Sequence, residues 1–147
     1  MIITDMTENH VAQVAELEKV CFGSAAWSEK SIASELENPL SIWLVMVEAD
    51  KVLGYVGSQT VIDETDMMNI AVHPDYRRKG IAGSLVEALI ARLKACGSRQ
   101  LTLEVRVSNE SARRLYDELG FCEIAIRKRY YQNPKEDALI LRKEWDL

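Results

Sequence analysis

Several classes of protein depend on residues that this sequence hardly contains. It has only three cysteines, Cys21, Cys96 and Cys122, and two histidines, His10 and His73. An odd number of widely spaced cysteines argues against a disulfide framework and is typical of a reducing compartment. Because the cysteines and histidines do not lie at the spacings of metal ligands, we expect no bound metal.

The chain also lacks a long apolar run and an excess of positive charge. No stretch approaches the roughly 20 apolar residues that a membrane-spanning helix needs. The N-terminus, MIITDMTENH, has no basic segment followed by an apolar one, as a signal peptide would. The net charge of −5 argues against a general nucleic-acid binder. We therefore expect a cytoplasmic protein that binds neither nucleic acid nor membrane.

What remains is the composition of an ordinary globular protein. Its 147 residues are 48% hydrophobic and 28% charged. This length is sufficient for one domain with a substantial core. The sequence contains no internal repeat, low-complexity segment or linker. We therefore predict a single domain over residues 1–147.

Hydrophobic periodicity and turn residues divide the chain into strands and helices. The predicted strands are residues 1–4, 41–49, 51–62, 66–72, 99–107, 122–131 and 137–145. The predicted helices run between Thr7 and Gly23, from Ser28 to about Leu36, from near Gly80 to Gly97, and over 109–120. In this order, an antiparallel meander is followed by a β-α-β crossover. The sequence therefore predicts an α/β protein with a mixed sheet and helices on both faces.

The stretch HPDYRRKGIAGSL, residues 73–85, places three cations directly before a predicted helix. The first N–H groups of a helix have no partner within the helix, and the helix dipole is positive at that end. Gly80 and Gly83 would let an anion approach the backbone closely. This pattern indicates a phosphate site, although a turn with solvated cations fits it equally well. Neither the P-loop pattern nor the dinucleotide fingerprint is present.

The same stretch carries a resemblance to a known family. RRKGIA, residues 77–82, is similar to the Q/R-x-x-G-x-G/A pyrophosphate loop of the GNAT N-acetyltransferases. NIAVHPDYRRKGIAGSL and LEVRVSNESARRLYDELGF resemble the two central blocks of that superfamily. WSEKS, LEVRVSN, ARRLYDELGF and RKRYY are most similar to the bacterial ribosomal-protein alanine N-acetyltransferases. The resemblance covers nearly the whole chain and implies the GNAT fold, in which about four helices flank both faces of a mixed, mostly antiparallel sheet.

The resemblance also implies acetyl-CoA as the co-substrate. In the family, backbone groups of the strand before the loop contact the pantetheine arm, and here these would belong to Ile70, Ala71 and Val72. The loop and first helical turn that would hold the pyrophosphate are Arg77, Arg78, Lys79, Gly80, Ile81, Ala82 and Gly83. The resemblance places Asn109 on the coenzyme arm as well. From its position alone, Asn109 is a good N-cap for the helix that follows.

The predicted strand 99–107 has one apolar and one polar face. The apolar face holds Leu101, Leu103, Val105 and Val107, and the polar face holds Thr102, Glu104 and Arg106. A central strand packed on both faces would be apolar throughout, so the polar face indicates an opening onto a cleft. Alternation alone fits a solvated edge strand better, with Glu104 paired to Arg106 or to nothing. The resemblance reverses this, because Glu104 aligns with the general base of the alanine acetyltransferases.

Four aromatic residues are further candidates for the site. Tyr116 lies at helical core spacing, which favours a structural role. In many GNAT enzymes, however, a tyrosine that aligns with Tyr116 donates a proton to the coenzyme sulfur, and we predict this general-acid role. The resemblance places Tyr130 and Tyr131 near the acceptor peptide. Trp27 is expected to pack the loop between the first two helices and to shape the acceptor groove.

The resemblance implies transfer of the acetyl group of acetyl-CoA to the α-amine of an N-terminal alanine on a ribosomal small-subunit protein. The amine would attack directly in a ternary complex, and we expect a monomer or weak dimer. Two alternatives stay open: a GNAT enzyme for another amine, such as a lysine, polyamine or antibiotic, and a CoA-binding regulatory module without activity. The presence of both Glu104 and Tyr116 argues against the second alternative.

Overall fold

The chain folds into strands and α-helices in the order that the sequence predicts. The computed structural model describes residues 1–146. Within these residues the strands are β1 (Ile2–Asp5), β2 (Ser41–Glu48), β3 (Lys51–Val61), β4 (Glu64–Val72), β5 (Gln100–Arg106), β6 (Cys122–Tyr131) and β7 (Glu136–Glu144). The α-helices are α1 (Glu8–Phe22), α2 (Glu29–Glu35), α3 (Ile81–Ala95) and α4 (Glu110–Glu118). The predicted order of elements is confirmed.

The strands form one mixed sheet. Their spatial order is β1-β2-β3-β4-β5-β7-β6. β4 and β5 run parallel, and the other neighbouring pairs of the described sheet are antiparallel. β7 returns between β5 and β6, so β5 is a central strand with β4 on one side and β7 on the other. The predicted mixed, mostly antiparallel sheet is confirmed.

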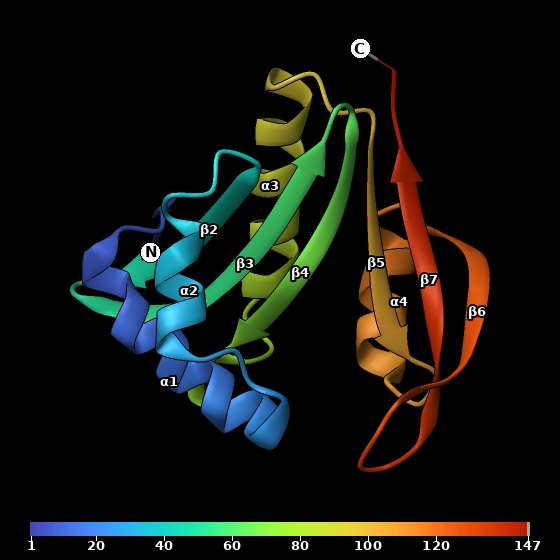
Figure 1. The fold of residues 1–147 in the computed structure, drawn as a ribbon, viewed down its shortest axis with the longest axis horizontal. Helices are drawn as coiled ribbons and strands as arrows, with labels where there is room; N and C mark the ends of the chain where they lie inside the picture. The colour runs from blue at the N-terminus through green and yellow to red at the C-terminus, as the bar shows by residue number, and fades with distance from the viewer. Residues whose placement is uncertain (147) are drawn as a thin grey trace.

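Helices cover both faces of the sheet, as the sequence predicts (Figure 1). α1 and α2 pack on one face, in a cluster that includes the fully buried Val14, Ile32 and Tyr55. α3 and α4 pack on the other face, in a larger cluster that includes the fully buried Leu89 and Leu101. Burial of such side chains stabilises the fold by about 1.5–3 kcal/mol each. The sheet is therefore fixed from both sides.

The residues that limit the first two helices act as the sequence indicates. Thr7 is the N-cap of α1, and its N–H donates to Nδ1 of His10 over 2.9 Å. Ser28 is the N-cap of α2, where its Oγ accepts from the Ser31 N–H at 3.0 Å. Gly23 follows α1 with a φ of +55°. This left-handed conformation costs glycine little, and it ends the helix there.

β4 and β5 pair at one end and then diverge (Figure 1). Their parallel register covers residues 64–66 and 100–102. Further along β4, the register with β3 shifts between Met67 and Asn69, which leaves Met68 as an extra residue. A bulge of this kind bends the strand that carries it. Side chains from the diverging parts of both strands line a cavity.

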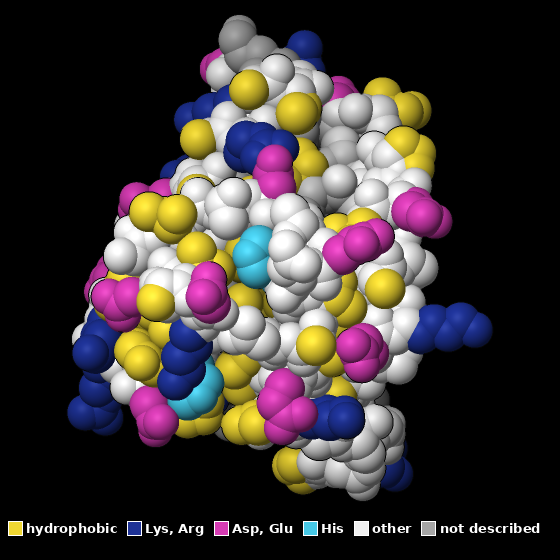
Figure 2. All heavy atoms as spheres, turned by 90° about the vertical axis from the view of Figure 1, so that its left-hand side faces the viewer, with side chains coloured by type: hydrophobic (Ala, Val, Ile, Leu, Met, Phe, Trp, Pro, Cys, Tyr) yellow, Lys and Arg dark blue, Asp and Glu magenta, His cyan; other side chains and the backbone are white. Residues whose placement is uncertain are grey.

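The surface carries charges of both signs. On the side that lies at left in Figure 1, acidic and basic side chains are interspersed (Figure 2). None of the helices within residues 1–146 combines the length and the apolar character needed to cross a membrane.

Candidate active site

Two adjoining cavities lie where β4 and β5 diverge. The strand cavity, of about 700 Å³, is lined by β4, β5, α4, the end of β6 and the loop after it. The loop cavity, of about 670 Å³, is lined by the end of β4, the loop that follows it, the start of α3 and α4. Both are lined by Cys21, Phe22, Ile70, Asn109, Ala112 and Tyr116. Because they share these residues, the two cavities are halves of one cleft.

The loop cavity brings together most of the residues predicted to hold the coenzyme. Its lining includes Ile70, Ala71, Val72, Arg77, Arg78, Gly80, Ile81, Ala82, Gly83 and Asn109. Lys79 is not part of this lining, and its ammonium lies 5.5 Å from the centre of the Tyr76 ring. The local motif therefore forms one wall of a cavity, with the Lys79 side chain turned to a neighbouring aromatic ring.

The backbone at the start of α3 is suited to an anion. Arg78 and Gly80 have left-handed φ values of +64° and +75°. Gly80 is the N-cap of α3 and makes no side-chain cap hydrogen bond. The first N–H groups of α3 therefore lack a side-chain partner at the positive end of the helix dipole. A Cβ built on Gly80 meets no heavy atom within 4 Å, so the position opens onto free space.

Arg77 adds a side-chain cation to this wall. Its Nε donates to the Val72 carbonyl over 3.4 Å, and its Nη2 lies 3.6 Å from Sγ of Cys21. These contacts hold the guanidinium between β4 and α1, where it lines the loop cavity. A cation and uncapped N–H groups thus share one cavity, the combination that binds phosphate groups.

Glu104 projects from β5 into the strand cavity. The Oε1 atom of Glu104 lies 3.6 Å from Nη1 of Arg127. A hydrogen bond between the Tyr130 hydroxyl and the Glu104 carboxylate is the main cause that raises the pKa of Tyr130. The pairing with Arg106 considered from the sequence is wrong, because Arg106 instead pairs with Glu136 at 3.3 Å. The edge-strand interpretation is wrong too, since β5 is central. The polar face of β5 opens onto a cleft, which is the interpretation that the resemblance favours over alternation alone.

Tyr116 occupies the junction of the two cavities. Its side chain belongs to the core cluster and is 4% exposed, with the Phe121 ring edge-on at 5.4 Å. Its hydroxyl donates to Sδ of Met67 at 4.0 Å, a weak acceptor. Burial, with a smaller contribution from the charge of Tyr131, raises the pKa of Tyr116 to about 12. The hydroxyl therefore stays protonated at neutral pH and is free to donate to a better acceptor.

Asn109 is the N-cap of α4, as its position indicates, and its contact with the coenzyme arm stays a prediction. Its Oδ1 accepts from the Ala112 N–H at 3.2 Å, which makes it the N-cap of α4. The same residue lines both halves of the cleft. Its Nδ2 donors are not used by the cap, so capping and a contact to a ligand are compatible.

The remaining aromatic candidates separate into two groups. Tyr130 and Tyr131 line the strand cavity, with their rings edge-to-face at 5.1 Å. Trp27 is absent from the lining of either cavity within the described chain, and it packs edge-on against Trp43 at 5.5 Å. Trp27 thus packs the region between α1 and α2, as expected. A role in shaping the acceptor groove would be indirect, because Trp27 does not line the cleft.

Sequence reasoning missed a buried carboxyl next to the strand cavity. Glu18 of α1 is 0% exposed, and its two carboxyl oxygens accept from Nδ2 of Asn69 at 2.7 and 3.0 Å. Burial raises the pKa of Glu18. Asn69 lines the strand cavity, so Glu18 fixes the orientation of a wall residue. A glutamate on the apolar stripe of α1, beside Val14 and Leu17, is the signal that could have identified it.

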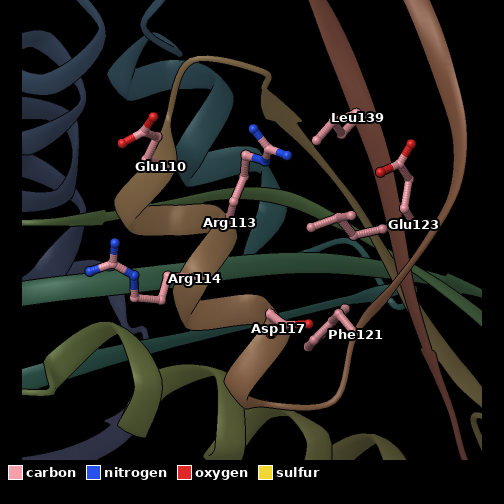
Figure 3. A pocket seen from close by; sticks show the side chains of 8 residues that line it. Glu110, Arg113, Arg114, Asp117, Phe121, Glu123 and Leu139 are labelled. Carbon is pink, nitrogen blue, oxygen red and sulfur yellow. The ribbon is translucent and has the colours of Figure 1, made fainter.

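A further hollow of about 530 Å³ lies on another face of α4 (Figure 3). It is lined by Glu110, Arg113, Arg114, Asp117, Phe121, Glu123, Leu139 and Leu141. None of the predicted site residues is among them, so this hollow is separate from the cleft.

Across residues 1–146, no three His, Cys, Asp or Glu side chains are grouped as metal ligands.

Comparison with known proteins connects this cleft to a family. The chain matches the model of the acetyltransferase (GNAT) family over residues 11–121. It is 41% identical to the ribosomal protein bS18-alanine N-acetyltransferase of Escherichia coli (strain K12). The alignment of 117 residues covers 78% of each chain. It is 34% identical over 143 residues to the protein of the same name from Haemophilus ducreyi, which covers 95% of this chain and 97% of that one.

Solved structures agree with the sequence relationship. The crystal structure of the ribosomal-protein-S18-alanine N-acetyltransferase from Escherichia coli has a TM-score of 0.90 at 34% identity, covering 99% of this chain and 94% of that one. An aminoglycoside 6'-N-acetyltransferase complexed with coenzyme A has a TM-score of 0.86 over 98% of this chain and 97% of that one. At 17% identity, the second likeness concerns the fold alone. The fold implied by the motifs is confirmed, and the chain belongs to the GNAT family of acetyltransferases.

Proposed function

We propose that residues 1–147 act as a single catalytic domain that transfers the acetyl group of acetyl-CoA to the α-amine of an N-terminal alanine. The continuity of the cleft carries this proposal: the loop of residues 77–80 lies at one end, Glu104 at the other, and Tyr116 lines both halves. The relatives named for the alanine of ribosomal protein bS18 support a small-subunit ribosomal protein as the acceptor. An acceptor of this kind would be encountered in the cytoplasm.

The loop cavity would hold the coenzyme. The N–H groups of residues 78–83 and the Arg77 guanidinium suit the pyrophosphate, and the end of β4 suits the pantetheine arm. Asn109 has free amide donors for the same arm. The acetyl thioester would then lie at the junction of the two cavities, beside Tyr116. Lys79 would contribute charge from outside the cavity lining.

The transfer needs a base for the attacking ammonium and an acid for the departing thiolate, and the cleft has one group for each role. Glu104 takes the proton that the attacking ammonium must lose. The neutral nitrogen forms a bond to the thioester carbonyl carbon, and the carbon–sulfur bond of the resulting tetrahedral intermediate then breaks. Tyr116 gives its proton to the departing thiolate, which accepts it more strongly than Met67 does. The nitrogen loses its second proton as the intermediate breaks down, which returns Tyr116 to its protonated form, and the proton on Glu104 passes to solvent. The acetyl group ends on the nitrogen, the coenzyme leaves as a thiol, and one proton is released overall.

The strand cavity would receive the acceptor peptide. The carboxylate of Glu104 already binds a cation, the Arg127 guanidinium at 3.6 Å, which an incoming ammonium can replace. Tyr130 and Tyr131 offer aromatic walls to the first residues of the peptide, while Trp27 supports the α1–α2 side from behind. A peptide α-amine has a pKa near 7.7–8.0, so roughly a tenth of it is neutral at pH 7, whereas a lysine amine near 10.4 is almost fully charged.

A peptide with two competing amines tests the acceptor. The peptide begins with alanine, carries one internal lysine, and is incubated with acetyl-CoA and the purified protein. Fragmentation by mass spectrometry is expected to place the acetyl group on the α-amine, and a matched peptide with a blocked N-terminus should react far more slowly. Equal rates on both peptides, or transfer only to polyamines, would contradict the acceptor. Absence of any transfer would support a CoA-binding module instead.

Substitution of Gly80 by valine tests the coenzyme site. Valine at a φ of +75° is strained, and its side chain would enter the space expected for the pyrophosphate. In the parent, acetyl-CoA at 100 times its Kd should stabilise the fold by about 2.7 kcal/mol, seen as a higher Tm. We expect the Gly80→Val variant to lose this shift.

Gly97 provides the matched control. It follows α3 at the opposite end, with a φ of +87° and no heavy atom within 4 Å of a built Cβ. Gly97→Val therefore carries a similar backbone strain far from the loop, and it should keep the full response to acetyl-CoA. If Gly80→Val responded as strongly as Gly97→Val, the loop would not be the pyrophosphate site.

A further inference from the structure

Arg106 binds the loop that joins β6 to β7. Its Nη2 donates to the Gln132 carbonyl at 3.1 Å, and its Nη1 donates to the Pro134 carbonyl at 3.0 Å. Asn133, between these two residues, lines the strand cavity. One guanidinium therefore holds the backbone on both sides of a residue in the cavity wall.

The same guanidinium also fixes an aromatic wall of the cavity. Its carbon lies 4.4 Å from the centre of the Tyr131 ring, within the range of a cation–π contact. Burial is the main cause that raises the pKa of Tyr131 to about 12, and the nearby Glu104 charge adds to it. Tyr131 is consequently neutral at physiological pH, and the contact is between a cation and an intact phenol ring.

Glu136 connects this loop to the coenzyme side of the cleft. Its Oε1 lies 3.3 Å from Arg106 Nη1, and its Oε2 accepts from the Ser108 N–H at 2.6 Å. Ser108 directly precedes Asn109, the N-cap of α4 that lines both cavities. The hydrogen bond from Ser108 lowers the pKa of Glu136, with Arg106 acting in the same direction. Glu136 is therefore charged throughout the neutral range, and the connection persists there.

The geometry requires an arginine at this position. Four partners surround one planar side chain: two carbonyls, a carboxylate and an aromatic face. A guanidinium presents its donors in a rigid fork and stacks on rings, whereas a lysine ammonium is a point charge that cannot serve all four sites. The side chains of Arg106 and Glu136 are 31% and 18% exposed, so the pair is partly shielded from solvent.

We propose that Arg106 and Glu136 are positioning residues that hold the β6–β7 loop and Tyr131 in the shape that receives the acceptor. This inference rests on the proposed function, because it assigns the strand cavity to the acceptor. Arg106 itself lines the strand cavity, and the pair acts on acceptor binding by fixing the shape of that wall. Arg106 does not line the loop cavity, and the hydrogen bond from Ser108 to Glu136 does not involve it, so replacement of Arg106 should leave the affinity for acetyl-CoA close to the parental value.

Arg106→Lys tests the proposal through a split between KM and kcat. The KM for the alanine peptide should rise roughly tenfold to a hundredfold, the range expected from losing a charge-assisted hydrogen bond. The kcat and the Kd for acetyl-CoA should stay close to the parental values. A merely destabilised protein would instead lose kcat in proportion to its unfolded fraction, with KM unchanged.

Arg142→Lys is the matched control. Arg142 lies on β7 with a 34% exposed side chain, donates to Thr102 at 2.9 Å and pairs with Glu144 at 3.8 Å, outside the cleft lining. Arg142→Lys replaces an arginine with a lysine, as Arg106→Lys does, but on the neighbouring strand. The KM for the peptide should not change in this variant. An equal rise in KM for both variants would contradict a specific role for Arg106.

Amide hydrogen exchange tests the loop without any reaction. In the ligand-free protein, Arg106→Lys should accelerate exchange over residues 128–136, and Arg142→Lys should not. If the parent did not acetylate the peptide, the proposed function would fail while this measurement still decided whether Arg106 holds the loop. Parental exchange in the loop of Arg106→Lys, or a parental KM, would overturn the proposal.

Discussion

Glu104→Gln is expected to lower kcat/KM for the alanine peptide by about 10²–10⁴-fold at pH 7, the usual contribution of a general base. The amide keeps the size of the side chain but cannot accept the proton of the attacking ammonium. The loss should become smaller as pH rises above about 8, because solvent then deprotonates the α-amine. Steady-state rates measured from pH 6.5 to 9.5 for the parent and the variant give this comparison.

Glu123→Gln is the control for the charge. Glu123 lies on β6 and lines the hollow on the other face of α4, away from the cleft. Removing its carboxylate changes the net charge of the protein by the same amount as removing that of Glu104, and it should leave the pH profile unaltered. A constant factor between parent and Glu104→Gln at pH 7 and pH 9 would mean that Glu104 positions the peptide and does not remove its proton.

Tyr116→Phe is expected to reduce kcat by about 10²–10⁴-fold while leaving the fold and acetyl-CoA binding intact. Phenylalanine preserves the ring that packs against Phe121, and the lost hydroxyl has only a thioether acceptor at 4.0 Å. The free energy of unfolding should therefore change by about 1 kcal/mol or less. Single-turnover rates, with a thermal melt and acetyl-CoA titration of the same sample, separate chemistry from folding.

The raised pKa of Tyr116 adds a pH signature. A tyrosine whose pKa is about 12 keeps its proton well above the ordinary value near 10. The parental kcat should therefore show no decline from loss of this proton up to about pH 10, and the deficit of Tyr116→Phe should be constant over the same range. A variant that turned over at the parental rate would leave Tyr116 with its core role alone.

Local features of the sequence predict the elements well, because each depends on near neighbours. The N-caps Thr7 and Ser28 and the break at Gly23 follow from single residues and their φ preferences. The motif of residues 77–82 is a continuous segment, and all of its residues except Lys79 line one cavity. In these parts, sequence order and spatial order coincide.

Pairings between distant segments could not be predicted in the same way. β5 is central because β4 lies on one side of it and β7 on the other. The residues of β5 alone do not indicate which strands are its neighbours. The partner of Glu104 is consequently Arg127 of β6, and Arg106 binds Glu136 of β7. The contribution of Cys21 to both cavities likewise depends on how α1 packs across β4.

Tyr116 shows why spacing alone could not assign its role. A core stripe and a catalytic position looked like alternatives, yet the structure has a side chain that is 4% exposed and also lines both halves of the cleft. The burial that makes it a core residue also raises its pKa and keeps the hydroxyl protonated. The two interpretations describe one physical environment.

A crystal structure with a bisubstrate analogue tests the account most directly. In such an analogue, the α-nitrogen of an alanine-first peptide is joined through an acetyl linker to the sulfur of coenzyme A. We expect the pyrophosphate against residues 78–83, the sulfur beside the Tyr116 hydroxyl, and the peptide nitrogen within hydrogen-bond reach of Glu104, directly or through one water. An analogue bound in the hollow on the other face of α4, or one with its sulfur remote from Tyr116, would contradict the account.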